Sequence, residues 1–195
     1  MKIQGASRGS EEPSLGKIRT EIDEQIANMI QAQHVFFVAT APLASEGNIN
    51  LSPKGLDTFR ILGPRTVAYL DVIGSGVETI AHLKENGRIV LMFCAFQGAP
   101  IIVRLHGSGR VVEPNASEFP ELAAQFPHYE TARAIIVVEL TRISNSCGFG
   151  VPLLKYEGER DQHYRWAQRK GPEGLRTYKQ QKNQRSIDGL AGLAE

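Results

Sequence analysis

The stretch VAYLDVIGSGVETIAHLKENGRIVLMF, residues 67–93, decides the class of fold. An apolar run rich in β-branched and aromatic residues, 65–73, ends in a glycine loop and predicts a strand. Helical spacing of apolar residues over 76–86 follows, and Gly87 stands where a helix commonly ends. A second apolar run, 88–96, begins at once and predicts another strand. The order is therefore strand, glycine loop, helix, strand.

The glycine loop comes close to the dinucleotide fingerprint G-x-G-x-x-G, but Thr79 stands in place of the third glycine. That glycine allows close packing of helix on strand in a Rossmann site. The strand over 88–96 also ends without an acidic residue to hold a ribose, and the next element, 100–113, is another strand rather than a crossover helix. These features favour an antiparallel sheet over a doubly wound parallel one.

The remaining segments extend the antiparallel pattern. Further strands are predicted at 34–41, 48–52, 100–113 and 132–146, and helices at about 18–32, within 117–127, at 161–171 and at 172–183. Gly171 and Pro172 separate the last two helices. We predict a mainly β fold, a six-stranded antiparallel barrel with flanking helices. Its parts are an N-terminal arm over 1–17, the barrel over 18–147, and a helical extension over 148–195 that packs on the barrel or on a second copy.

Composition restricts the function classes. The chain has 195 residues, a net charge of +1 and two cysteines, Cys94 and Cys147. Such a charge argues against a general nucleic-acid binder, and no apolar run reaches the length of a membrane span. The first residues lack the apolar region of a secretory signal, so we expect a cytoplasmic protein without disulfides. Residues 151–185 hold nine Lys or Arg against four acids, which favours a solvated helical face but leaves an anionic ligand open.

Two features of the sequence could converge on one phosphate. The stretch NINLSPKGLD, 48–57, reads as a short strand that runs into Pro53 and presents Lys54 on a glycine turn. The glycine-flanked start of the helix after the loop exposes backbone N–H groups, which favour phosphate. Ser75 and Glu78 also have capping-box spacing, which predicts that Ser75 closes this helix.

With these residues in place, the sequence resembles the pyridoxamine 5'-phosphate oxidase-like family of FMN-binding split β-barrels. The resemblance covers roughly 18–145 and is carried by HVFFVATA, NLSPKG, VAYLDVIGSG, HLKENGRIVLMF and IIVRLHGSGRVV. SCGFGVP, KGPEGL and SIDGL resemble a bacterial and fungal subgroup of unidentified substrate. The resemblance implies a split barrel, a homodimer with FMN at the subunit interface, and oxidoreductase chemistry on a small molecule.

The resemblance also implies a cofactor site. Lys54 matches the family's strand lysine near the phosphate, residues 69–71 match the strand bordering the flavin, Ser75 matches the hydroxyl at the helix start, and Arg104 matches a later basic residue. The full predicted FMN site comprises Asn50, Ser52, Pro53, Lys54, Gly55, Tyr69, Leu70, Asp71, Ser75, Gly76, Thr79, Arg104, Phe149 and Trp166. No metal site and no catalytic residue are predicted.

The chain departs from true pyridoxamine phosphate oxidases at the cationic positions. Asn48 and Asn50 stand where an arginine opens the lysine strand, and Gly76 and Val77 stand where an Arg-Lys pair follows the loop serine. We therefore do not predict vitamin B6 synthesis. A flavin-storing protein without turnover, or a haem- or deazaflavin-binding member of the same barrel, remain alternatives. Among the histidines, we expect His82 to pair with Glu78, and His128 and His163 to be exposed.

Overall fold

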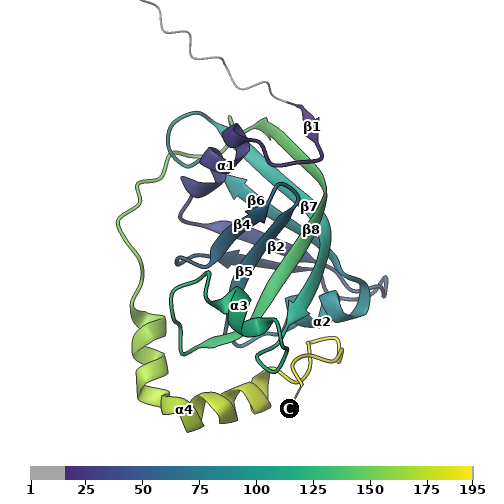
Figure 1. The fold of residues 1–195 in the computed structure, drawn as a ribbon, viewed down its shortest axis with the longest axis vertical. Helices are drawn as coiled ribbons and strands as arrows, with labels where there is room; N and C mark the ends of the chain where they lie inside the picture. The colour runs from purple at the N-terminus through teal and green to yellow at the C-terminus, as the bar shows by residue number, and fades with distance from the viewer. Residues whose placement is uncertain (1–15, 195) are drawn as a thin grey trace, which may run out of the picture.

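The computed structural model describes residues 16–194 and contains one eight-stranded antiparallel sheet and four helices (Figure 1). The elements in chain order are β1 (Ile18–Arg19), α1 (Glu24–Gln31), β2 (Phe36–Thr40), β3 (Asn50–Lys54), β4 (Phe59–Gly63), β5 (Thr66–Val72), α2 (Glu78–Asn86), β6 (Arg88–Cys94), β7 (Ile101–Val112), α3 (Phe119–Ala123), β8 (Ala132–Cys147) and α4 (Gln162–Lys182). The predicted arm falls mainly on residues 1–15, which lie outside the described part. Gly16 and Lys17 donate backbone hydrogen bonds to Asn145.

The sheet is curved into a barrel that stays open along one seam. Its strand order is β3-β2-β6-β7-β8-β5-β4, with β1 paired to the far part of β8. The 16-residue β8 is long enough to pair with β5, β7 and β1. β3 and β4 are the two outer strands of this order, so the seam lies between them. The predicted class, a mainly β split barrel with flanking helices, is confirmed.

The strand count of six was too low, because β1 and β4 were missed. β1 has only two residues, and the first turn of the expected helix is replaced by its pairing with β8. Asp23 then caps α1 by accepting a hydrogen bond from the N–H of Ile26. β4 has only five residues, and although Phe59 and Ile61 pack against the core, Leu62 is 37% exposed, so its apolar pattern in sequence is short and broken.

Four aromatic rings close the barrel interior across the seam. Phe36 of β2 contacts Phe59 of β4, Tyr69 of β5 and Phe93 of β6, with ring centroids 5.4–5.6 Å apart. Two of these pairs are edge-to-face and the Phe36–Phe93 pair is stacked, and both geometries contribute beyond their buried area. The two sides of the open seam are thus joined by side chains rather than by a backbone ladder.

The C-terminal extension lies against the barrel end that carries α2 (Figure 1). α4 is broken at Gly171, whose φ of 62° is left-handed, and Pro172 follows, as the sequence predicted. Ala167 and Leu175, one from each half of α4, pack on Ile73. The Asn183 side chain then donates to the carbonyl of Gly74, which ties the extension to the glycine loop.

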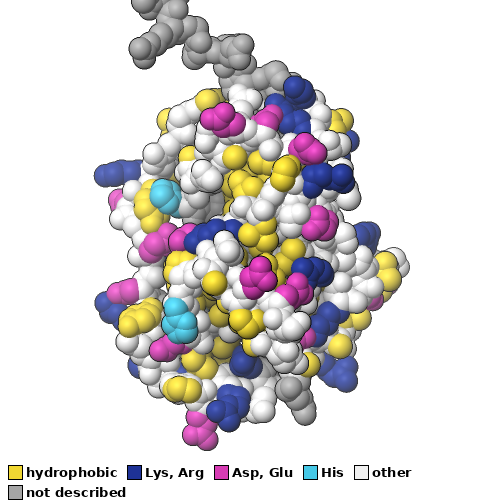
Figure 2. Space-filling view, in the orientation of Figure 1, with side chains coloured by type: hydrophobic (Ala, Val, Ile, Leu, Met, Phe, Trp, Pro, Cys, Tyr) yellow, Lys and Arg dark blue, Asp and Glu magenta, His cyan; other side chains and the backbone are white. Residues whose placement is uncertain are grey.

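The surface carries no strong bias of charge on the face shown in Figure 2, where acidic and basic side chains are interspersed around apolar ones. Within the described residues, no helix combines the length and the apolar character needed to cross a membrane.

The aromatic cluster makes a stability prediction. Phe93 is 2% exposed, and Phe93→Ala should lower the free energy of unfolding by about 3–5 kcal/mol, because it removes packing at the seam. Phe149→Ala is the matched control, since Phe149 is 79% exposed and its loss should change stability by less than about 0.5 kcal/mol. Urea unfolding of both variants measures the difference, and similar losses would contradict a closed aromatic interior.

Candidate functional site

A cavity of about 290 Å³ lies beside β3, between the end of β5, the glycine loop, the first turn of α2 and α4. Eight residues of the predicted cofactor site line it: Asn50, Ser52, Pro53, Lys54, Gly55, Leu70, Gly76 and Thr79. Segments far apart in sequence thus meet around one space.

The pleat of β3 explains why its polar residues face inward. Asn50, Ser52 and Lys54 alternate along the strand and pair with Thr40, Val38 and Phe36 of β2, which are all buried. Residues of a directly opposed pair share one face of a sheet. The three polar side chains therefore point to the inner face, while Leu51, between them, is 65% exposed. Pro53 is tolerated because β3 is an edge strand.

The turn after β3 holds an unusual backbone conformation. Leu56 has a φ of 61°, the left-handed region that costs a side-chain-bearing residue about 1 kcal/mol. The Thr58 hydroxyl donates to the carbonyl of Gly55 and fixes this turn. Leu56 lines the cavity next to Lys54, so the strained residue lies at the candidate site.

A fully buried carboxylate organises the charges of the site. Asp71 of β5 accepts from Lys54 Nζ at 2.8 Å on one oxygen and from Arg133 Nε at 2.8 Å on the other. Arg133 also donates from Nη1 to the carbonyl of Gly76 at 2.8 Å. Asp71 itself lies beneath the cavity, and it holds two cations from separate strands at the glycine loop.

The two cations beside Asp71 favour the deprotonated form of its carboxyl group. Burial alone would raise the pKa of this carboxyl, but the charges of Lys54 and Arg133 and their hydrogen bonds lower it below the usual 3.8. Asp71 is thus a carboxylate at neutral pH. The neighbouring Tyr69 stays a neutral phenol, since burial and the Asp71 charge raise its pKa well above the usual 10.0.

Arg133 was missed by the sequence analysis, although it is the most buried cation of the site at 5% exposure. The available signal was its place in the apolar strand ARAIIVVEL. A charged side chain within a buried strand is tolerated only when it is paired. Its partner, Asp71, is 62 residues away in sequence, so the pair was not recognised.

A chain of hydrogen bonds orients the polar groups of β3. Asn50 donates from Nδ2 to the hydroxyl oxygens of Thr40 and Thr79, at 3.1 and 3.0 Å, and its Oδ1 accepts from Ser52. Both amide hydrogens of Asn50 are therefore used within the protein. Thr79 accepts this bond, and its hydroxyl also interacts with the buried phenol of Tyr69.

The expected ion pair between His82 and Glu78 is wrong. His82 is fully buried and its Nδ1 bonds to the Thr40 hydroxyl at 2.9 Å, at the inner end of the same chain of hydrogen bonds. Glu78 instead accepts from the backbone N–H of Ile187. The predicted capping box is also wrong: Val77 is the N-cap of α2 and makes no side-chain capping bond. The Glu78 carboxylate, which the capping-box spacing assigned to the start of α2, therefore binds a segment near the C-terminus instead.

His163 of α4 lines the cavity and is half-buried rather than exposed. Its Nε2 lies 3.1 Å from the carbonyl of Ile73, so Nε2 carries the hydrogen and Nδ1 remains for other partners. Trp166 stacks on the His163 ring and meets Tyr178 edge to face. Trp166 therefore supports a residue of the cavity without lining it. His128 is exposed, as predicted.

The other predicted residues lie outside the cavity lining. Tyr69 is wholly buried in the aromatic interior, and Ser75 is exposed on the glycine loop. Arg104 donates to the Ser146 hydroxyl at 3.0 Å, away from the residues lining the cavity. Phe149 lies on the surface. Their assignment to a cofactor stays a prediction.

The sequence profile described as pyridoxamine 5'-phosphate oxidase matches residues 22–147, which span every strand of the barrel except β1. The chain belongs to this family. A relative in Aspergillus flavus, the pyridoxamine 5'-phosphate oxidase family protein ustO, is 38% identical over 189 residues, covering 88% of this chain and 76% of ustO.

The barrel is also similar to solved structures. The crystal structure of HupZ from Group A Streptococcus superposes with a TM-score of 0.51 at 21% identity, covering 64% of this chain and 93% of HupZ. At this identity the likeness concerns the fold alone. The family profile ends at residue 147, so α4, with His163, lies beyond the matched region.

The buried ion pair predicts a response to mutation and to acid. Asp71→Asn should cost about 3–5 kcal/mol of unfolding free energy, because it leaves buried Arg133 without its charge partner.

In the wild type the folded-state pKa of Asp71 is lowered, so its contribution to stability is present above the usual 3.8 and is lost as pH falls through the lowered pKa. Urea unfolding at pH 7 and at about pH 3 should show a larger loss in the wild type than in the variant, in which Asp57 and Asp188 still have lowered pKa values.

The matched control for that experiment is Asp161→Asn, which breaks an exposed pair with Arg165. It should change stability by at most about 1 kcal/mol. An Asp71→Asn cost no greater than that of Asp161→Asn would show that the buried pair does not stabilise the barrel.

Proposed function

We propose that this chain binds FMN in the cavity beside β3 and uses it to oxidise or reduce a small molecule. One observation carries the proposal: in a member of the pyridoxamine 5'-phosphate oxidase family, Lys54 and Arg133 are both held at the start of α2 by the buried Asp71. This arrangement supports a phosphate site between β3 and the glycine loop.

The donors around the cavity suit a phosphate group. Lys54 and Arg133 supply charge, and the first turn of α2 supplies backbone N–H groups that have no partner within the helix. A methyl group added at Gly74 or Gly76 would meet no atom closer than 3.6 Å, so the loop leaves room for a ligand to approach the backbone. The residues present therefore fit the phosphate end of a flavin.

The balance of positive and negative side chains around the cavity predicts a moderate affinity for FMN. Lys54 and Arg133 are offset by Asp71 beneath them and by Glu78 at the cavity wall. Arg133 replaces one of the cations that the chain lacks relative to true pyridoxamine phosphate oxidases. Much of the attraction for a phosphate would come from hydrogen-bond donors and the α2 dipole rather than from net charge.

Bound flavin would supply the hydride and electron transfer. The chain's own residues would bind and orient it, with Lys54 and Arg133 at the phosphate. His163 Nδ1 is the candidate for moving a proton at the cavity, because its Nε2–H is already held by Ile73 and its ring by Trp166.

We also propose that a second copy of the chain covers the cavity. Ile49, just before the edge strand β3, and Leu51, within it, are 77% and 65% exposed, on the strand whose other face lines the cavity. Exposed apolar side chains along an edge strand are typical of a protein–protein contact.

The alternative of a flavin store without turnover is tested by reduction. Anaerobic addition of NADPH to the flavin-loaded protein should bleach the flavin absorbance if the chain is an oxidoreductase with this donor class. Persistent absorbance with NADPH and NADH, alongside a chemical reductant control that does bleach it, would favour the store.

Lys54 gives the direct test of the cofactor site. Lys54→Met should weaken FMN binding by roughly tenfold or more, because it removes one charge-assisted hydrogen bond worth about 1.5–3 kcal/mol. Titration of flavin fluorescence measures the dissociation constant. Lys182→Met, which removes an exposed lysine outside this cavity, is the control; equal affinity in the two variants would refute the assignment of Lys54.

A further inference from the structure

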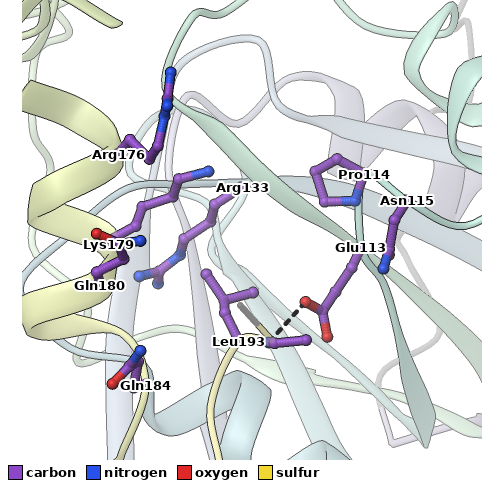
Figure 3. Close-up of a pocket in the computed structure, with 10 residues that line it drawn as sticks. Glu113, Pro114, Asn115, Arg133, Arg176, Lys179, Gln180, Gln184 and Leu193 are labelled. Atoms are coloured by element: carbon purple, nitrogen blue, oxygen red, sulfur yellow. Dashed lines mark hydrogen bonds between the residues drawn. The ribbon is translucent and has the colours of Figure 1, made fainter. Parts of the chain in front are cut away.

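A second cavity, of about 270 Å³, lies between the end of β7, α4 and the last residues of the chain (Figure 3). Arg133 lines both this cavity and the one beside β3. Apart from Arg133 and residues 113–115, the lining comes from 176–194, beyond the part of the chain that matches the family profile. We call it the C-terminal cavity.

The charge of the C-terminal cavity is positive. Arg176 and Lys179 are three residues apart on α4 and so share one helix face. Within residues 16–194, neither side chain makes an ion pair or a hydrogen bond. Glu113, opposite them, is already satisfied: Lys84 Nζ donates to one oxygen at 2.6 Å and the N–H of Ala194 to the other at 3.0 Å. Among the described residues, no carboxylate pairs with either cation.

Arg133 contributes a buried donor to the same space. Its Nε and Nη1 are bound to Asp71 and to the carbonyl of Gly76, and Nη2 has no hydrogen bond to any described residue. At 5% exposure the side chain cannot turn out to solvent. In Figure 3, Arg133 and Lys179 extend from opposite elements into the space between α4 and the sheet, while Arg176 lies on the same helix with its guanidinium pointing away from them. The Arg133 guanidinium thus brings a third positive charge to the lining of this cavity, and charged donors form the stronger hydrogen bonds to anions.

The walls of the cavity are fixed by backbone contacts. Gly192 donates to the carbonyl of Gln184, and Leu193 donates to that of Asn183. A Cβ on Gly192 would lie 2.3 Å from the Asn183 oxygen and 2.9 Å from Val77, so only glycine permits this close approach. Lys84 donates to the Gly192 carbonyl as well as to Glu113. The cations thus face a wall held in place by the barrel.

We propose that the C-terminal cavity binds the phosphate group of a small phosphomonoester, at a site distinct from the cavity beside β3. The two cations without a carboxylate partner match a dianion, whereas a single carboxylate would leave one of them unpaired. Pro114 and Leu193 line the same cavity and offer apolar contact to the organic part of such a molecule. The proposal does not depend on flavin binding.

Calorimetric titration of the full chain with inorganic phosphate and with phenyl phosphate, at low ionic strength, tests the site. Both should bind saturably, and Arg176→Gln with Lys179→Gln should weaken binding at least about tenfold. Tighter binding of phenyl phosphate would identify a phosphomonoester as the ligand, and equal affinities would overturn that identification in favour of free phosphate.

The control double variant, Arg169→Gln with Lys182→Gln, removes the same charge from exposed positions of α4 that do not line the cavity. It should change the affinity by less than about twofold. Equal weakening in both double variants, or no saturable binding by the wild type, would each overturn the proposal. FMN titration of the same samples separates this outcome from a failure of the flavin site.

Discussion

The buried carboxylate of Asp71 is the constraint on which both cavities depend. It joins Lys54 on the edge strand β3 to Arg133 on β8, although β3 and β5 share no backbone ladder. A carboxylate removed from water is costly unless it is paired and hydrogen-bonded, so its two cations are held with little freedom. The same pairing that closes one part of the open barrel therefore positions the charges of the candidate site.

Arg133 supplies a cation to a site that lacks several cationic residues of true pyridoxamine phosphate oxidases. The segment before Lys54 and the segment after Ser75 both lack the expected arginines. A cation from β8 reaches the glycine loop instead and bonds to the carbonyl of Gly76. Because Asp71 and Glu78 offset the two cations, the site is closer to neutral than a set of several arginines would be. Selectivity for a ligand would then depend on directed hydrogen bonds more than on long-range attraction.

The C-terminal extension lines both cavities together with the barrel. It supplies His163 to the cavity beside β3, and Arg176, Lys179 and Leu193 to the C-terminal cavity. Asn183 and Ile187 bind the glycine loop and the first residue of α2 through Gly74 and Glu78. A ligand in either cavity would contact the same guanidinium of Arg133, which gives a physical route for one site to influence the other.

The sequence by itself determined the barrel class, most of its strands and the break of α4. Apolar alternation, the glycine after α2 and the Gly171–Pro172 pair act over a few residues, so they can be recognised from local pattern alone. Lys54 and the glycine loop were also recognisable, because each has a local signature. Only the tertiary structure decided which groups share a site. Arg133 meets Asp71 across 62 residues, Ile187 takes Glu78 across 109, and His82 reaches Thr40 across 42. These contacts were not predictable from local spacing. A buried polar group must be hydrogen-bonded, and its partner is whichever group the folded chain places within hydrogen-bond distance.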